Sequence, residues 1–105
     1  MTPDQRLKLA QALFQEAVIC SERNDIKDAR DLSELAVKHE FKDEIERIIK
    51  GDVKVFKMVI QNQYSKNAKV NIVSRIMLNI LMDNEDFKKT FREKYVHLCF
   101  EMESY

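Results

Sequence analysis

The chain has 105 residues, of which 45% are hydrophobic and 34% are charged, and its 18 basic and 18 acidic side chains cancel. This length suffices for one domain with a hydrophobic core, and this composition excludes an intrinsically disordered chain. No apolar run approaches the roughly 20 residues that cross a bilayer, which excludes a membrane-spanning helix. One Gly and one Pro occur, and because sheet-rich small domains need many turn residues, this scarcity favours helices.

The spacing of apolar residues predicts an all-α fold, a compact bundle of five to six helices that forms a single domain over residues 1–105. The first helix runs from about Pro3 to Cys20, with Thr2 as its N-cap. Asp25 is the expected N-cap of the second helix. Small residues would let these two helices pack closely as a hairpin, and they are Ala17, Ala29 and Ala36.

A short third helix is predicted over residues 42–50, and Gly51 follows it. Because glycine adopts the left-handed conformation freely, we expect the helix to end there. Asp52 is the expected N-cap of the fourth helix. The residues expected on the inner face of that helix are Val53, Phe56, Val59, Ile60 and Tyr64.

The fifth helix, near residues 68–82, is the most apolar, because nine of the thirteen residues from 70 to 82 are apolar. We expect it to be the central helix of the bundle, covered on most sides. Asp83 or Asn84 would cap a sixth helix. That helix carries an apolar stripe at steps of three and four residues, formed by Phe87, Phe91, Tyr95, Leu98, Met102 and Tyr105.

Basic residues gather in the middle of the chain, where residues 47–82 hold seven basic side chains against one acidic side chain. We select five of them as a candidate surface for nucleic acid or for a small anionic ligand between helices. This basic set consists of Lys54, Lys57, Lys66, Lys69 and Arg75. A solvated helix face, paired with the more acidic first half of the chain, is the alternative interpretation.

A second group of apolar side chains lies away from the main stripes. On a regular helix Val96 and Phe100 project well away from the stripe of the sixth helix, and Leu78 and Met82 share an arc with Asn71 and Arg75. Apolar residues on two faces of one helix indicate a central position in the fold or a partner. We therefore predict a protein interface that contains Val96, Phe100, Leu78 and Met82.

No arrangement of residues predicts catalysis, a metal or a cofactor. Glu93, His97 and Glu101 share one helix face, but no second helix supplies further metal ligands. The two cysteines, Cys20 and Cys99, are far apart in sequence. Cys20 ends the first helix, where the helix dipole disfavours a thiolate, and Cys99 sits beside the apolar stripe, so we interpret both as reduced core or boundary residues.

Together these patterns predict a non-enzymatic interaction protein that binds another macromolecule through its helix faces, as an adaptor, inhibitor or assembly factor. We expect a protein partner, a homodimer or small homo-oligomer, and a location in the cytoplasm without membrane contact. Binding of nucleic acid through the basic set is the alternative prediction, and binding of a small anionic ligand is a third.

Overall fold

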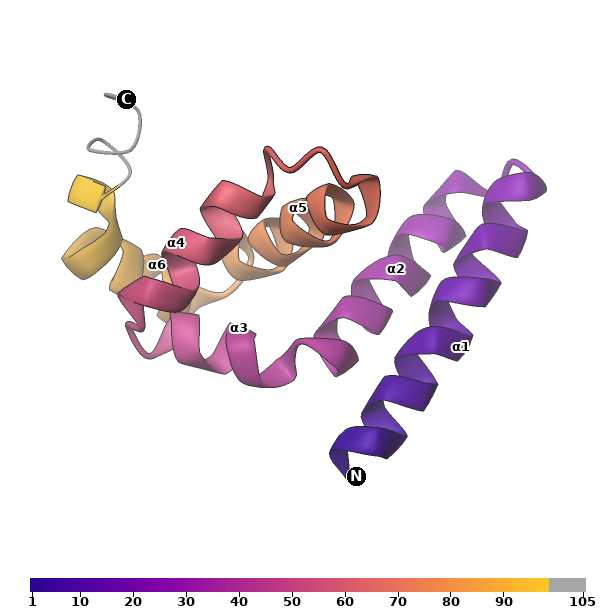
Figure 1. Cartoon of the computed structure of the whole chain (residues 1–105), viewed down its shortest axis with the longest axis horizontal. Helices are drawn as coiled ribbons and strands as arrows, with labels where there is room; N and C mark the ends of the chain where they lie inside the picture. Colours follow the sequence, from indigo (N-terminus) through magenta and orange to yellow (C-terminus); the bar gives the residue numbers. More distant parts are fainter. Residues whose placement is uncertain (99–105) are drawn as a thin grey trace. The chain divides into compact units, whose positions relative to one another are not determined.

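A computed structural model describes residues 1–98 of the chain, which contain six α-helices and no β-strand (Figure 1). The all-α prediction is therefore confirmed. The chain divides into two compact units, which we call unit 1 (residues 1–42) and unit 2 (residues 43–105). The predicted single domain over residues 1–105 stays a prediction. Phe100, Glu101, Met102 and Tyr105, together with Cys99, lie outside the described residues.

Unit 1 is a hairpin of two helices, α1 (Pro3–Glu22) and α2 (Ile26–Glu40), which pack along each other (Figure 1). The predicted N-cap of α1 is confirmed as a capping box. The Thr2 hydroxyl accepts a hydrogen bond from the Gln5 N–H at 3.2 Å, and the Gln5 side chain accepts one from the Thr2 N–H at 2.9 Å. This exchange satisfies two of the backbone donors that a helix start leaves free.

The turn between α1 and α2 places Asn24 at a φ of +62°. The Asp25 N–H donates to the Cys20 carbonyl at 2.8 Å, and the Asn24 N–H donates to the Ser21 carbonyl at 3.1 Å. These two bonds are the Schellman arrangement that ends many helices. Asp25 is the N-cap of α2, as predicted, but its side chain does not cap the helix. A hydrogen bond with Asp25 instead raises the pKa of the Asp28 carboxyl.

Small side chains let the two helices of unit 1 pack close together. Ala10 and Ala17 on α1 and Ala36 on α2 are buried, and the short alanine side chain lets helix backbones approach closely. The predicted role of Ala17 and Ala36 agrees with this burial. Val18 and Ile26, in contrast, are 57% and 63% exposed, so unit 1 leaves large apolar side chains on its surface.

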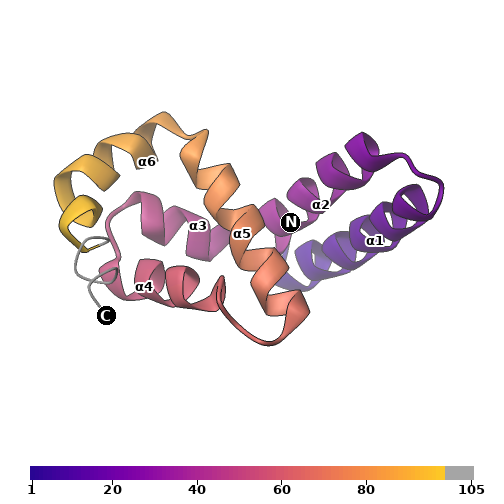
Figure 2. The same ribbon diagram turned by 90° about the horizontal axis from the view of Figure 1, so that it is seen from above.

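Unit 2 contains four helices and a short π-helical turn. They are α3 (Lys42–Ile49), α4 (Val53–Asn62), α5 (Ala68–Met82), α6 (Glu85–Thr90) and η1 (Phe91–Tyr95). The chain reverses direction between α3 and α4, and α5 packs beside both α4 and α6 (Figure 2). Asn67 and Asn84 cap α5 and α6 through their side chains.

The reversal between α3 and α4 is built on Gly51, whose φ is +101°. The Gly51 N–H donates to the Ile48 carbonyl at 3.1 Å, and the Asp52 N–H donates to the Arg47 carbonyl at 3.0 Å. The Asp52 carboxylate then accepts from the Val55 N–H at 3.3 Å and starts α4. One helix therefore ends in a Schellman motif whose final residue is the N-cap of the next. The predicted roles of Gly51 and Asp52 are confirmed.

Two hydroxyl groups from the C-terminal part of unit 2 bind the end of α3. Tyr95 donates to the Ile48 carbonyl, and Thr90 donates to the Ile49 carbonyl, each at 2.7 Å. The last carbonyls of a helix have no partner within it, so these bonds provide partners that the helix lacks. Burial, and to a lesser extent the charge of Asp52, raises the pKa of Tyr95 to about 12. The phenol therefore stays neutral and keeps its donor hydrogen.

Aromatic side chains fill the space behind these hydroxyl bonds. The rings of Phe56 and Tyr95 lie 4.1 Å apart between centroids, and Phe87 lies 6.0 Å from Phe56 and 6.1 Å from Tyr95. All three side chains are buried. Each such pair contributes about 0.5–1.5 kcal/mol beyond the area that it buries. This aromatic cluster packs α4 against α6 and η1. In the sequence, α5 lies between α4 and these two elements.

Two expectations about the core are wrong in detail. Val53 and Tyr64, both predicted on the inner face of the fourth helix, are 37% and 78% exposed. Val53 is the first residue of α4, and Tyr64 lies beyond its end at Asn62. The most apolar helix is also less covered than expected. α5 buries Val73, Met77 and Leu81, but Ile72 and Met82 on its other faces are 55% and 64% exposed.

The positive φ of Gly51 predicts that Gly51→Ala lowers the free energy of unfolding by about 1–3 kcal/mol, because an L side chain is strained in that conformation. An added Cβ would also lie 2.8 Å from the Lys94 ammonium nitrogen. Urea unfolding of Gly51→Ala with and without Lys94→Ala separates the two causes. If Lys94→Ala restored full stability, backbone strain would not be the reason.

Tyr95→Phe should lower the free energy of unfolding by about 1 kcal/mol at pH 7, because it removes one hydrogen bond while Ile48 keeps the bond from Gly51. The folded-state pKa of about 12 lies above the ordinary value of 10.0. The neutral phenol therefore stabilises the fold fully below pH ~10, and this contribution disappears as the pH rises through ~12.

The measurement compares urea unfolding of the wild type and of Tyr95→Phe from pH 8 upward. The stability difference between them should shrink above pH ~10. Tyr64→Phe is the matched control, because Tyr64 is exposed, and it should not alter the pH dependence. An unchanged difference between the wild type and Tyr95→Phe across that range would contradict the burial of a neutral Tyr95.

Candidate functional site

Two residues of the predicted protein interface lie at one pocket of unit 2. Leu78 is half-buried and Met82 is exposed, and both line the pocket from α5. Val96, just after η1, is half-buried and does not line it. Phe100 lies outside the described residues. The structure therefore brings two of the four predicted interface residues together.

The pocket has a volume of about 450 Å³ and is lined by side chains from or next to α4, α5, α6 and η1. Seven of its nine lining residues carry no charge. The complete lining consists of Phe56, Ile60, Gln63, Leu78, Met82, Phe87, Lys88, Phe91 and Arg92.

The aromatic cluster forms the buried part of this pocket. Phe56 and Phe87 are buried, and Phe91 is half-buried with its ring 5.9 Å from that of Phe87. The ring contact between Phe56 and Tyr95 packs α4 against η1. Tyr95 also donates to the Ile48 carbonyl at the end of α3. The position of the pocket wall therefore depends on Tyr95.

Lys88 and Arg92 are the charged residues of the pocket, and no acidic residue lines it. They are four positions apart, which places neighbouring side chains on one face of a helix. The Arg92 Nε donates to the Lys88 carbonyl at 3.4 Å. The Lys88 ammonium lies 3.1 Å from a Glu85 oxygen, and the Glu85 side chain is 84% exposed. Such an exposed ion pair contributes little stability.

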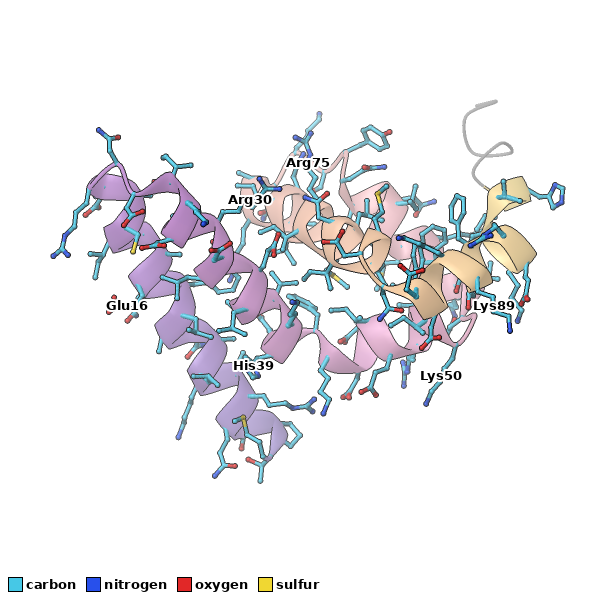
Figure 3. All side chains as sticks on the ribbon, turned by 180° about the vertical axis from the view of Figure 1, so that it is seen from behind. Glu16, Arg30, His39, Lys50, Arg75 and Lys89 are labelled. Carbon is cyan, nitrogen blue, oxygen red and sulfur yellow. The ribbon has the colours of Figure 1, made fainter. Side chains whose placement is uncertain are left out.

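The basic set is exposed but spread along unit 2. Lys54 and Lys57 lie one turn apart on α4, and Lys66 lies in the following loop. Lys69 and Arg75 are six positions apart on α5, hence rotated by ~120°, so they do not share a helix face. Arg75 extends from α5 in Figure 3. Within the described part of unit 2, no ion pair involves any of these five side chains.

Other residues singled out in the sequence form no site in residues 1–98. Glu93 and His97 are exposed, and Glu101 lies outside this part of the chain. No group of three His, Cys, Asp or Glu side chains suited to a metal ion occurs among these residues. Cys20 is a half-buried free thiol, and Cys99 is outside the described part.

Sequence reasoning missed Lys88 and Arg92 as site residues. A repeated aromatic–cation pair could have revealed them, because Phe87-Lys88 recurs as Phe91-Arg92 four positions later. In a helix this spacing places the two aromatic rings on one face and the two cations on an adjacent one. That repeat borders the pocket.

Comparisons with protein-family models, with curated proteins and with solved structures find no similar protein. Within residues 1–98, none of the helices is both long enough and apolar enough to pass through a membrane.

Proposed function

We propose that the chain is a non-enzymatic interaction protein that binds another macromolecule, including a second copy of itself, through exposed helix faces. Met82 is the observation that carries this proposal. It is a large apolar side chain, it is 64% exposed, and it lies beside a concave apolar pocket. Covering such a surface removes apolar area from water, which favours association. We place this activity in the cytoplasm as part of the same proposal.

Exposed apolar side chains in unit 1 support the proposal independently of the pocket. Val18 and Ile26 are more than half exposed on a hairpin of only two helices. A hairpin of two helices buries little apolar surface within itself, so covering these side chains by other helices would stabilise it. Both units thus offer apolar helix faces to a partner.

Nucleic-acid binding through the basic set is a second candidate function. It is supported by the exposure of Lys54, Lys57, Lys66, Lys69 and Arg75 and by the lack of ion pairs to them within the described part of unit 2. Cations that no carboxylate neutralises are available to phosphate groups. Their spread along α4, the loop and α5 suits an extended backbone better than a compact anion.

Met82→Lys is expected to weaken self-association at least tenfold, because a charge at an apolar contact must be desolvated. Since Met82 is exposed, the variant should keep the helix content and the unfolding midpoint of the wild type. Light scattering over a concentration series, at low and high salt, measures the change. The wild-type assembly should persist at high salt, because apolar contacts are not screened.

Met58→Lys is the matched control. Met58 is 49% exposed on α4 but does not line the pocket, so the same substitution there should leave the mass unchanged. A wild type that is monomeric at both salt concentrations would contradict self-association. If Met82→Lys and Met58→Lys weakened self-association equally, the face around Met82 would not be the specific contact surface.

Lys54→Glu combined with Lys57→Glu tests the nucleic-acid function. Because both side chains are exposed, the charge reversal should abolish binding to single- or double-stranded DNA and RNA while changing thermal stability little. A titration with fluorescent oligonucleotides at several salt concentrations measures this, and wild-type affinity should fall steeply with salt. Binding that survives the reversal would exclude this part of the basic set as the site.

A further inference from the structure

We propose that the pocket of unit 2 binds a small amphiphilic carboxylate, with an apolar chain among the aromatic side chains and its carboxylate at Lys88 and Arg92. This inference goes beyond macromolecular association. The ligand is a small molecule, and its anionic group binds Lys88 and Arg92, which do not belong to the basic set.

The body of the pocket fits an apolar chain. Its volume of about 450 Å³ lies within the ~300–1,000 Å³ of typical small-molecule sites. Phe56 and Phe87 are buried in its wall, while Ile60 and Phe91 are half-buried. Gln63 is its one uncharged polar residue. Such a lining gives few hydrogen bonds to a polar ligand body, so a sugar or a nucleobase would lose most of its bonds to water without replacement.

The edge of the pocket fits an anionic group. Lys88 on α6 and Arg92 on η1 lie four positions apart, and no carboxylate belongs to the lining. Long cationic side chains cover apolar surface with their methylene stems and keep their charged ends at the water boundary. The guanidinium of an arginine presents parallel N–H groups that match the two oxygens of a carboxylate. Arg92 uses its Nε in the bond to the Lys88 carbonyl, which leaves its terminal NH₂ groups for a ligand.

The number of cations at this edge favours a single negative charge. Lys88 already shares its ammonium with Glu85 at 3.1 Å, so the net positive charge at the edge is about one. A ligand with several charges, such as a diphosphate, would bring more charge than these side chains neutralise. One carboxylate on an apolar chain matches both the body and the edge of the pocket.

Met82 provides a reporter at the pocket itself. The test uses the full chain with ¹³C-labelled methionine methyl groups, titrated with decanoate below its micelle concentration. The Met82 methyl signal, assigned with Met82→Leu, should shift and saturate. The Met58 signal should not move, because Met58 is exposed on α4 outside the pocket. A titration in which Met82 does not shift, or in which Met58 shifts equally, would overturn the site.

Two ligand comparisons test the chemical class without altering the protein. Affinity should rise from hexanoate to octanoate to decanoate, by up to about fourfold for each buried methylene group. Decanoate should bind about tenfold more tightly than decan-1-ol, because hydrogen bonds to charged groups are the stronger ones. Equal affinity for the acid and the alcohol, or tighter binding of decyltrimethylammonium, would overturn the anionic class.

A pair of variants with equal charge change tests the residue assignment. Arg92→Gln should weaken decanoate binding about tenfold and leave decan-1-ol binding unchanged. Lys89, which is labelled in Figure 3, directly follows Lys88 on α6 but does not line the pocket. Lys89→Gln removes one positive charge there and should leave both affinities unchanged. Equal weakening in both variants would show that only the net charge acts, and it would overturn the carboxylate position. Circular dichroism confirms that each variant keeps its helix content.

Discussion

The hydrogen bonds at the end of α3 are the constraint on which unit 2 depends. Gly51 lets the chain reverse there, and its N–H closes back onto the Ile48 carbonyl. Tyr95 donates to that same carbonyl from 47 positions further along the chain. One backbone oxygen thereby accepts bonds from the local turn and from η1. A carbonyl has two lone pairs, so both bonds can form at once. This arrangement converts a local helix end into a long-range connection.

The walls of the pocket depend on the same connection between Tyr95 and the end of α3. The Tyr95 ring that reaches the end of α3 also packs 4.1 Å from Phe56, which lies in the wall of the pocket. Phe87 touches both rings and lines the same pocket. The apolar surface that we propose for binding is therefore held by the aromatic cluster instead of by a mobile loop. Pre-formed walls of this kind reduce the ordering cost of binding.

Local signals in the sequence predicted the helices well, and long-range contacts account for what they missed. Thr2, Gly51 and Asp52 were identified because caps and left-handed turns act within a few residues. The bond from Tyr95 to Ile48 could not be predicted, since the apolar stripe indicates only that Tyr95 is inward. Leu78 and Met82 were selected as surplus apolar residues, and both line the pocket. The cations beside them were missed, because exposed lysine and arginine on a helix are ordinarily solvated.

Amide hydrogen exchange of the wild-type chain, measured residue by residue, tests the dependence of unit 2 on the end of α3 most directly. The account predicts that the Gly51 and Asp52 amides open with the same free energy as buried amides of α4 and α5, such as those of Val59 and Leu81, because all belong to one cooperative unit. Exchange of the Gly51 and Asp52 amides at the rate of an open chain, while Val59 and Leu81 stay protected, would contradict it. The turn would then be a local feature that the rest of the unit does not need.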